Sequence, residues 1–248
     1  MGLTGVGGGA LMTPILLLLG ISPALAVGTD LLYAALTKSA AVWIHHRNRT
    51  IQWRLVLLLS LGSIPAAALS VWLLRDLVSD TAGLNRVIVG TLSVSLILTA
   101  IVLLLRGRLH SFGSRHALPL VRRLHGPWRL RITIAGGFLI GVLVTISSVG
   151  AGALGAAILL LLYPRLLALR IVGTDIAHAV PLALVAGLGH FYLGNVDFSL
   201  LGSLLLGSLP GIYIGSRIGL QLPDRVLRPV LGSVLLVIGL GFAIAPPT

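Results

Sequence analysis

The chain has 248 residues, of which 56% are hydrophobic and only 10% are charged, against about 25% charged residues in an ordinary soluble domain. Apolar runs of about 20 residues recur along its length, so we expect one polytopic membrane domain with the lipid bilayer as its solvent. The net charge of +12 comes from arginines in connecting segments, which indicates membrane orientation and argues against nucleic acid as a partner. The chain has no cysteine, which excludes disulfides and thiolate metal sites, and no cofactor is expected.

The first half predicts half of a broken helix followed by three spans. Residues 1–20 join a glycine cluster to an apolar stretch too short to cross a bilayer, and they lack the basic leading region of a cleavable signal peptide. The three spans are expected at residues 23–45, 53–74 and 83–105. The segment 106–129 is rich in arginine and free of acids, so the positive-inside rule places it in the cytoplasm.

The second half begins with a segment that is too long for a single span. Residues 130–164 are interrupted by small residues at 147–152, which predicts a re-entrant or short helical hairpin that turns there. Three further spans are expected at residues 168–190, 198–218 and 226–245. The predicted fold is therefore an all-α polytopic membrane protein with a first repeat at 1–105, a basic loop at 106–129 and a second repeat at 130–248.

An internal repeat relates the two halves. The sequence Val-Gly-Thr-Asp occurs at residues 27–30 and again at 172–175, an offset of 145 residues. The same register aligns His45 with His190 and the Gly-Ser-x-Pro segment at 62–65 with its copy at 207–210. Leucine-rich sequence produces scattered matches by chance, but it does not produce these three matches in one register, so we interpret them as a duplication.

The charges near equivalent spans predict that the two repeats run in opposite directions. Arg47, Arg49 and Arg54 flank the end of the first span, whereas the matching residues 191–199 contain no lysine or arginine. Conversely, the uncharged segment 20–23 corresponds to a segment in which Arg165 and Arg170 occur. Equivalent loops therefore favour opposite sides of the membrane, as in transporters with inverted repeats.

The first repeat lacks a counterpart of residues 130–145, because Met1 aligns with Ile146. An unpaired helix end at bilayer depth is costly. We therefore expect either a native reading frame that begins upstream or an abbreviated N-terminal element.

Three short motifs occur in order along the chain: the glycine cluster at residues 5–9 with Pro14 after it, the Gly-Thr pair at 28–29, and the segment 194–197 after His190. These motifs resemble those of the sulfite exporter TauE/SafE family of bacterial anion transporters. The sequence departs from the family pattern in having aspartate after both Gly-Thr pairs. The resemblance covers nearly the whole chain and implies transport of sulfite or a small organosulfur anion across the bacterial inner membrane, where the protein would be multi-pass.

The glycine turns point to an anion independently of that resemblance. Successive glycines at Gly7, Gly8 and Gly9, and again from Gly150 to Gly152, let backbone N–H groups converge on an oxyanion, and a helix that begins there adds its positive end. The alternative is that these glycines only permit close packing or a sharp bend.

Lys38 is the only lysine in the chain and lies within the first predicted span. A charge near the bilayer centre costs at least about 2.5–3.5 kcal/mol on insertion scales, so function or pairing must offset it. Opposite span directions would bring Asp175 to the same depth. We expect Lys38 to bind the substrate anion while Asp175 holds or exchanges a proton; the alternative is a structural Lys38–Asp175 bridge.

Polar residues at helical spacing extend this site on both repeats. The predicted substrate-binding residues are Gly7, Gly8, Gly9, Thr29, Asp30, Lys38, Gly150, Gly152, Thr174 and Asp175. The candidates for proton coupling are Asp175, His178, His45 and His190, because imidazole titrates near neutral pH. Two structural roles compete with these: Asp30 and Asp175 would be helix caps at a break in each span, and His45 and His190 would be interfacial residues at span ends.

The leading functional hypothesis is a secondary transporter that moves a small anion by alternating access. The sequence has no P-loop, which argues against direct use of ATP. A passive anion channel is the main alternative. A membrane enzyme would use Ser147 and Ser148 with His178, or His178 with Asp175, but no sequence motif supports either combination. A scaffold for another membrane complex would tolerate substitution of Lys38 and Asp175. The sequence is also compatible with a homo-oligomer.

Overall fold

The computed structural model describes residues 9–77, 80–114, 128–219 and 224–246, with only the backbone described at 106–114, 209–219 and 224–228. The regular structure in these ranges is α-helical, and none of the described residues forms a strand. The helical membrane fold predicted from composition is therefore confirmed.

The helices of the first half lie where the hydropathy pattern placed them. They are α1 (Gly9–Leu18), α2 (Pro23–Arg47), α3 (Trp53–Arg75) and α4 (Thr81–Ser114). α1 has ten residues, in agreement with a half helix that cannot span alone. α4 continues past residue 105, so the first part of the predicted basic loop is helical, and residues 115–127 of that loop lie outside the described ranges.

The second half contains α6 (Arg129–Ser147), α7 (Ala153–Leu162), α8 (Ala168–Tyr192), α9 (Phe198–Gly219) and α10 (Asp224–Ile244). The turn between α6 and α7 occupies residues 148–152, as predicted. The two arms of this hairpin are unequal, because α6 has 19 residues and α7 has ten. The expectation of a short hairpin therefore holds for α7 alone.

Four of the described helices are long and apolar enough to cross a bilayer: α3, residues 81–105 of α4, α6 and α8. α2 has the same length of 25 residues as α8 but carries more polar residues and falls outside this set. Large apolar side chains such as Leu57 and Leu61 remain more than 60% exposed on outer faces. This distribution fits a multi-pass membrane protein whose outer faces contact lipid.

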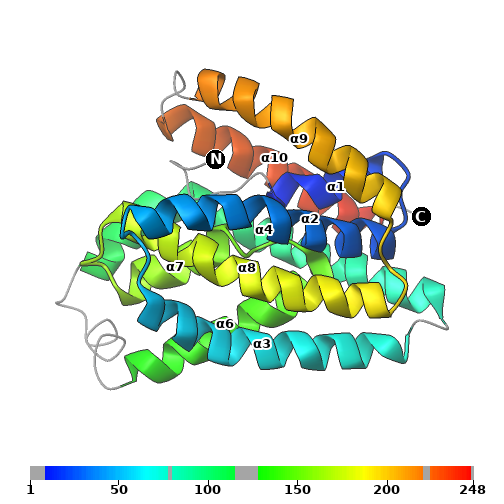
Figure 1. The fold of residues 1–248 in the computed structure, drawn as a ribbon, viewed down its shortest axis with the longest axis horizontal. Helices are drawn as coiled ribbons and strands as arrows, with labels where there is room; N and C mark the ends of the chain where they lie inside the picture. The colour runs from blue at the N-terminus through cyan, green and yellow to red at the C-terminus, as the bar shows by residue number, and fades with distance from the viewer. Residues whose placement is uncertain (1–8, 78–79, 115–127, 220–223, 247–248) are drawn as a thin grey trace.

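α2 and α8 form an antiparallel pair at the centre of the molecule (Figure 1). α3 packs against α8 and α6 on one side of this pair, and α10 packs against α4. The short helices α1 and α7 each pack against the central helix that follows them in sequence. Every broken segment therefore meets the central pair.

Small residues allow α3 and α6 to approach closely. A Cβ atom added to Gly62 of α3 would lie 2.7 Å from the backbone nitrogen of Phe138 on α6, and one added to Gly141 of α6 would lie 2.7 Å from Cα of Ser63. Backbone contact of this kind is typical of helix packing in membranes. It fixes the position of α6 and thereby the turn at residues 148–152.

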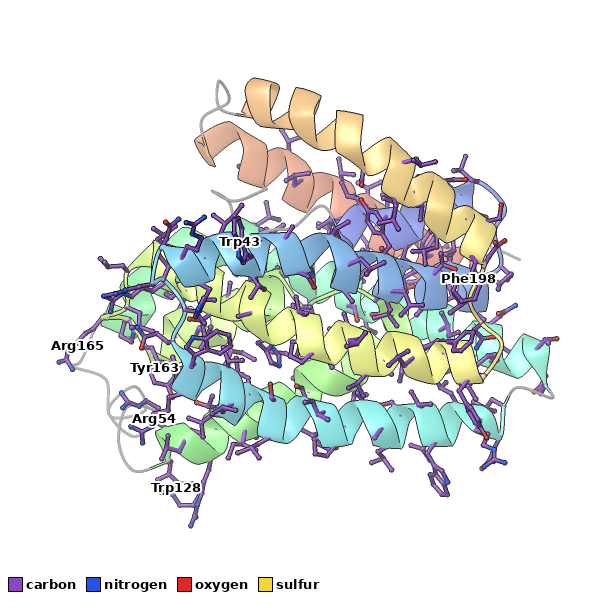
Figure 2. The ribbon with its side chains drawn as sticks, in the orientation of Figure 1. Trp43, Arg54, Trp128, Tyr163, Arg165 and Phe198 are labelled. Carbon is purple, nitrogen blue, oxygen red and sulfur yellow. The ribbon has the colours of Figure 1, made fainter. Side chains whose placement is uncertain are left out.

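Aromatic and basic side chains mark the two ends of the helices. Arg54, Trp128 and Arg165 lie at one end of the molecule, and Phe198 lies at the other (Figure 2). Phe198 is the repeat counterpart of Trp53, the residue next to Arg54. Equivalent positions of the two halves thus occur at opposite ends.

Candidate functional site

Asp30 is a fully buried carboxylate that connects the two broken segments. It lies within α2 at 0% exposure. Its Oδ2 atom accepts a hydrogen bond of 2.6 Å from the Thr13 hydroxyl of α1 and one of 2.9 Å from the Ser148 hydroxyl in the α6–α7 turn. One carboxylate oxygen is therefore held by both halves of the chain.

Asp175 occupies the equivalent position on α8 and is 1% exposed. Its carboxylate lies against Gly155 in the first turn of α7, where an added Cβ atom would overlap Oδ1. The N-terminal end of a helix favours a negative charge, because its first N–H groups are not used within the helix. The two aspartates thus match in sequence but differ in surroundings.

Lys38 lies on the same face of α2 as Asp30, two turns further along. Eight residues of helix correspond to about 12 Å, and a helical side chain leans toward the N-terminus of its helix. The ammonium group interacts electrostatically with Asp175 and with Asp30. The charge of the only lysine of the chain, a partly buried residue, therefore interacts with both repeated acids.

The α6–α7 turn brings main-chain groups close to this cluster. Ser148 has a φ of 58° and Gly150 a φ of 113°, and the second value is accessible to glycine at little cost. Gly152 directly precedes the first residue of α7. Of the first-half glycines, Gly9 begins α1, while Gly7 and Gly8 lie outside the described residues.

Thr29 and Thr174 make reciprocal hydrogen bonds between the halves. The Thr29 hydroxyl accepts from the backbone N–H of Asp197 at 3.0 Å, and the Thr174 hydroxyl accepts from that of Gln52 at 3.0 Å. Asp197 and Gln52 are themselves counterparts under the repeat register. These hydroxyls, predicted as substrate ligands, are occupied with backbone groups.

The glycines before these threonines show the same reciprocity. A Cβ atom added to Gly28 would lie 2.9 Å from the carbonyl carbon of Asn195 and 3.0 Å from Cβ of His190. One added to Gly173 would lie 2.9 Å from both Nδ1 of His45 and Oγ1 of Thr50. The start of each central helix therefore packs against the end of the other.

The three histidines differ in their surroundings. His178 is 0% exposed and its Nε2 lies 2.8 Å from the Ser63 hydroxyl of α3. His190 is also 0% exposed, and its Nε2 donates to the Thr145 carbonyl at 2.9 Å. An interfacial role is therefore wrong for His190. His45 is partly exposed, with Nδ1 at 2.8 Å from Thr50 Oγ1.

The helix-cap hypothesis for the two aspartates is wrong as well. α2 and α8 continue unbroken through Asp30 and Asp175, so neither residue caps a helix at a break. Both carboxylates instead project from within the first half of a continuous helix.

The serine that contacts His178 is not one of those in the α6–α7 turn. It is Ser63, whereas Ser148 donates to Asp30 and Ser147 to Ser95. The predicted combination of Ser147 or Ser148 with His178 is therefore not the one in the structure.

Sequence reasoning gave no role at the site to Thr13 and Gly155, and it named Ser148 only as a serine of the turn. It placed Ser63 at a helix kink beside the path, without predicting its contact with His178. Thr13 and Gly155 are recognisable once the register is known, because each lies in the short helix that precedes a repeated acid. Ser63 belongs to the repeated Gly-Ser-x-Pro segment.

Comparison with known proteins agrees with this architecture. Residues 1–242 match the family model described as sulfite exporter TauE/SafE. YjnA of Bacillus subtilis (strain 168), named a probable membrane transporter protein, is 40% identical over 247 residues, which cover 97% of this chain and 93% of that relative. YdhB from the same organism carries the same description and is 28% identical over 97% of this chain and 93% of its own length. No solved structure matches the chain significantly. This chain is a membrane transporter and belongs to the sulfite exporter TauE/SafE family.

Proposed function

We propose that the protein is a secondary transporter that moves a small anion, sulfite or a small organosulfur anion, by alternating access. The observation that carries this proposal is the electrostatic interaction of the partly buried Lys38 with two buried acids, Asp30 and Asp175, on the central helices that the broken segments contact. A lysine in such an environment requires a partner or a function. An anionic substrate supplies the function.

The two halves have inverted topology in this proposal. The pairs Thr29–Asp197 and Thr174–Gln52 exchange places when the halves are exchanged, which is the property of an interface with two-fold symmetry. α2 and α8 are antiparallel, so a two-fold axis that relates them is perpendicular to both helices. If both helices cross the bilayer, that axis lies in the membrane plane, as in transporters with inverted repeats.

Three features of the site favour an oxyanion substrate. Lys38 supplies a positive charge, the start of α7 supplies unused backbone N–H groups, and the turn before α7 is short enough to present them together. The family description supports a sulfur oxyanion in particular. The end of the molecule with Arg54 and Arg165 faces the cytoplasm, because arginine is enriched on that side.

Alternating access is favoured over a passive pore because one buried carboxylate connects the two broken segments, which move in this mechanism. Asp30 is bonded to α1 and to the α6–α7 turn, so the contact between the halves depends on the state of this one carboxylate. Proton coupling through the acids and His178 fits this arrangement. A pore would not require a contact that joins both broken segments.

Counterflow in proteoliposomes tests this function. Purified protein is reconstituted with sulfite, thiosulfate, sulfoacetate or chloride inside, and uptake of the same labelled anion is measured. We expect saturable counterflow of at least one sulfur anion and its loss in Lys38→Met, because methionine keeps the length of the side chain and removes the charge. Arg54→Gln, which removes an exposed charge at the start of α3, is the matched control and should transport normally.

Two results would contradict the proposal. Unchanged counterflow in Lys38→Met would show that Lys38 does not bind the transported anion. Flux that neither saturates nor shows counterflow would indicate a channel.

A further inference from the structure

Asp30 has one carboxylate oxygen that is fully used and one that is not. Oδ2 receives both hydroxyl donors, whereas Oδ1 is buried and has no hydrogen-bond partner among the described residues. An ionised carboxylate offers about four acceptor positions, and leaving a buried charged oxygen without a donor is expensive. A proton on Oδ1 removes that charge and leaves Oδ2 as the acceptor of both hydroxyl donors.

We propose that Asp30 is the group that carries the coupling proton, and that this proton binds together with the anion. The proposal rests on the transport function above and assigns the coupled ion and its residue. In the transport step, Oδ1 takes a proton from water on one side and becomes a neutral carboxylic acid. It returns the proton to water on the other side, with no other bond made or broken.

The charges around Asp30 determine whether the proton and the anion move in the same direction or in opposite directions. Lys38, on the same helix, interacts electrostatically with Asp30 and with Asp175 of α8, and His178 of α8 interacts with Lys38. His190 of α8 packs against Gly28, two residues before Asp30. α1 carries no titratable side chain, and neither does the α6–α7 turn. At the start of α9, Asp197 meets Thr29 through its backbone N–H, while its Oδ1 accepts from the amides of residues 199 and 200.

With both acids ionised, two negative charges face a single lysine, so the cluster repels an anion. Protonation of Asp30 leaves Lys38 and Asp175 balanced and makes room for one negative charge. Proton and anion therefore favour each other's binding, which is positive linkage, and they move in the same direction.

Asp175 is the less suitable proton carrier despite its matching sequence. Its carboxylate lies at the first turn of α7, where the helix end favours the charged form. Asp30 instead contacts α1 at the Thr13 side chain, which lies in the second turn of that short helix, whereas Asp175 contacts the first turn of α7. The structure thus assigns a fixed negative charge to one repeat and the exchangeable proton to the other.

The hydroxyl partners of Asp30 connect proton binding to movement. Thr13 belongs to the first half and Ser148 to the second, and both donate to the same oxygen. Hydrogen bonds to a carboxylate are about twice as strong as those to a neutral group. Protonation therefore weakens the contact between the halves, and loss of the proton restores it.

Within the described ranges no group of three histidine, cysteine, aspartate or glutamate residues is arranged to hold a metal ion. The two hydroxyl protons already point at Oδ2, which favours a proton over a sodium ion at this carboxylate. Sodium is nevertheless tested as a separate arm of the experiment.

The experiment compares accumulation with counterflow in proteoliposomes whose membrane potential is clamped. The probe is whichever of sulfite, thiosulfate and sulfoacetate the wild-type protein exchanges fastest. We expect an imposed gradient of one pH unit to drive up to about tenfold accumulation in the wild type, because that gradient is equivalent to a tenfold concentration ratio. Asp30→Asn, which imitates the neutral acid, should lose accumulation, and the rate of its remaining counterflow should no longer depend on pH. Asp80→Asn, which alters an exposed carboxylate at the start of α4, should keep both.

A second variant keeps the proposal testable if Asp30→Asn does not fold. Ser148→Ala removes one donor to the carboxylate, so the pH profile of accumulation should move to higher pH while counterflow persists. The proposal is overturned if Asp30→Asn accumulates anion like the wild type, if a sodium gradient at equal pH drives accumulation, or if Ser148→Ala leaves the profile unchanged. Absence of counterflow in the wild type would instead contradict the proposed function.

Discussion

Gly155 is the residue whose size most directly sets the position of Asp175. An added Cβ atom would overlap Oδ1, and that oxygen is the free end of a flexible side chain. The carboxylate can therefore move aside while the helices stay in place. A substitution at this residue separates the geometry of the site from the stability of the fold.

We predict that Gly155→Ala weakens anion binding by about tenfold or more with a small change in thermal stability, because a displaced Asp175 no longer balances Lys38. Binding to the purified protein and unfolding followed by tryptophan fluorescence measure the two effects. Gly202→Ala is the control, since no described atom lies within 4 Å of its added Cβ. An unchanged affinity in Gly155→Ala would remove Asp175 from the site.

The repeated threonines give a second prediction at this scale. Thr29→Val and Thr174→Val each leave a backbone N–H without its acceptor, so each should lower the free energy of unfolding by about 1–3 kcal/mol. Thr37→Val is the control, because its hydroxyl only donates to carbonyls of its own helix. Similar losses in the two variants are expected from equivalent bonds, and a loss in one alone would contradict the equivalence.

At the scale of helices, α3 and α9 occupy equivalent sequence positions but have different neighbours. Gly62 of α3 packs against the backbone of α6. Its counterpart Gly207 of α9 is exposed, and no described atom lies within 4 Å of its added Cβ. The repeat therefore supplies a matched pair of substitutions.

Gly62→Ala should destabilise the protein by about 1–3 kcal/mol, because the new methyl group meets backbone atoms that cannot move independently. Gly207→Ala should be neutral or stabilising by up to about 1 kcal/mol, because alanine favours the helix. Thermal unfolding in detergent compares the two. Equal effects would show that α9 is packed as tightly as α3.

Most helix positions followed from the sequence because a bilayer demands long apolar runs, and the turn at residues 148–152 followed from its small residues. The length of α4 did not follow, and neither did the ability of α6 to span a bilayer. Residues 106–114 are basic and polar, and helix formation there does not depend on hydropathy. α6 was expected only as one arm of a short hairpin, because its apolar run continues into that of α7 across a largely buried turn.

The site was predictable only in part. Asp30, Lys38 and Asp175 are conspicuous because charged residues within apolar spans are expensive. The roles of Thr13 and Ser148 could not be predicted, since the position of a hydroxyl residue within an apolar segment does not indicate its hydrogen-bond partner. Their bonds to Asp30 depend on how α1 and the α6–α7 turn meet α2, which is a property of the tertiary structure.

At the scale of the whole molecule, the proposed function depends on two halves that cross the membrane in opposite directions. The reciprocal contacts of α2 and α8 bring the starts of these helices to opposite ends, and they bring Lys38, Asp30 and Asp175 together. Parallel halves would place equivalent loops on the same side and would separate this cluster.

Accessibility of single cysteines tests this claim most directly, because the chain has no cysteine of its own. His46→Cys and Phe191→Cys mark equivalent positions at the ends of α2 and α8, and both native residues are exposed. A membrane-impermeant maleimide applied to right-side-out and inside-out vesicles should label the two variants from opposite sides, with His46→Cys reacting from the cytoplasm. Labelling of both variants from the same side would contradict the inverted arrangement and the transport site built on it.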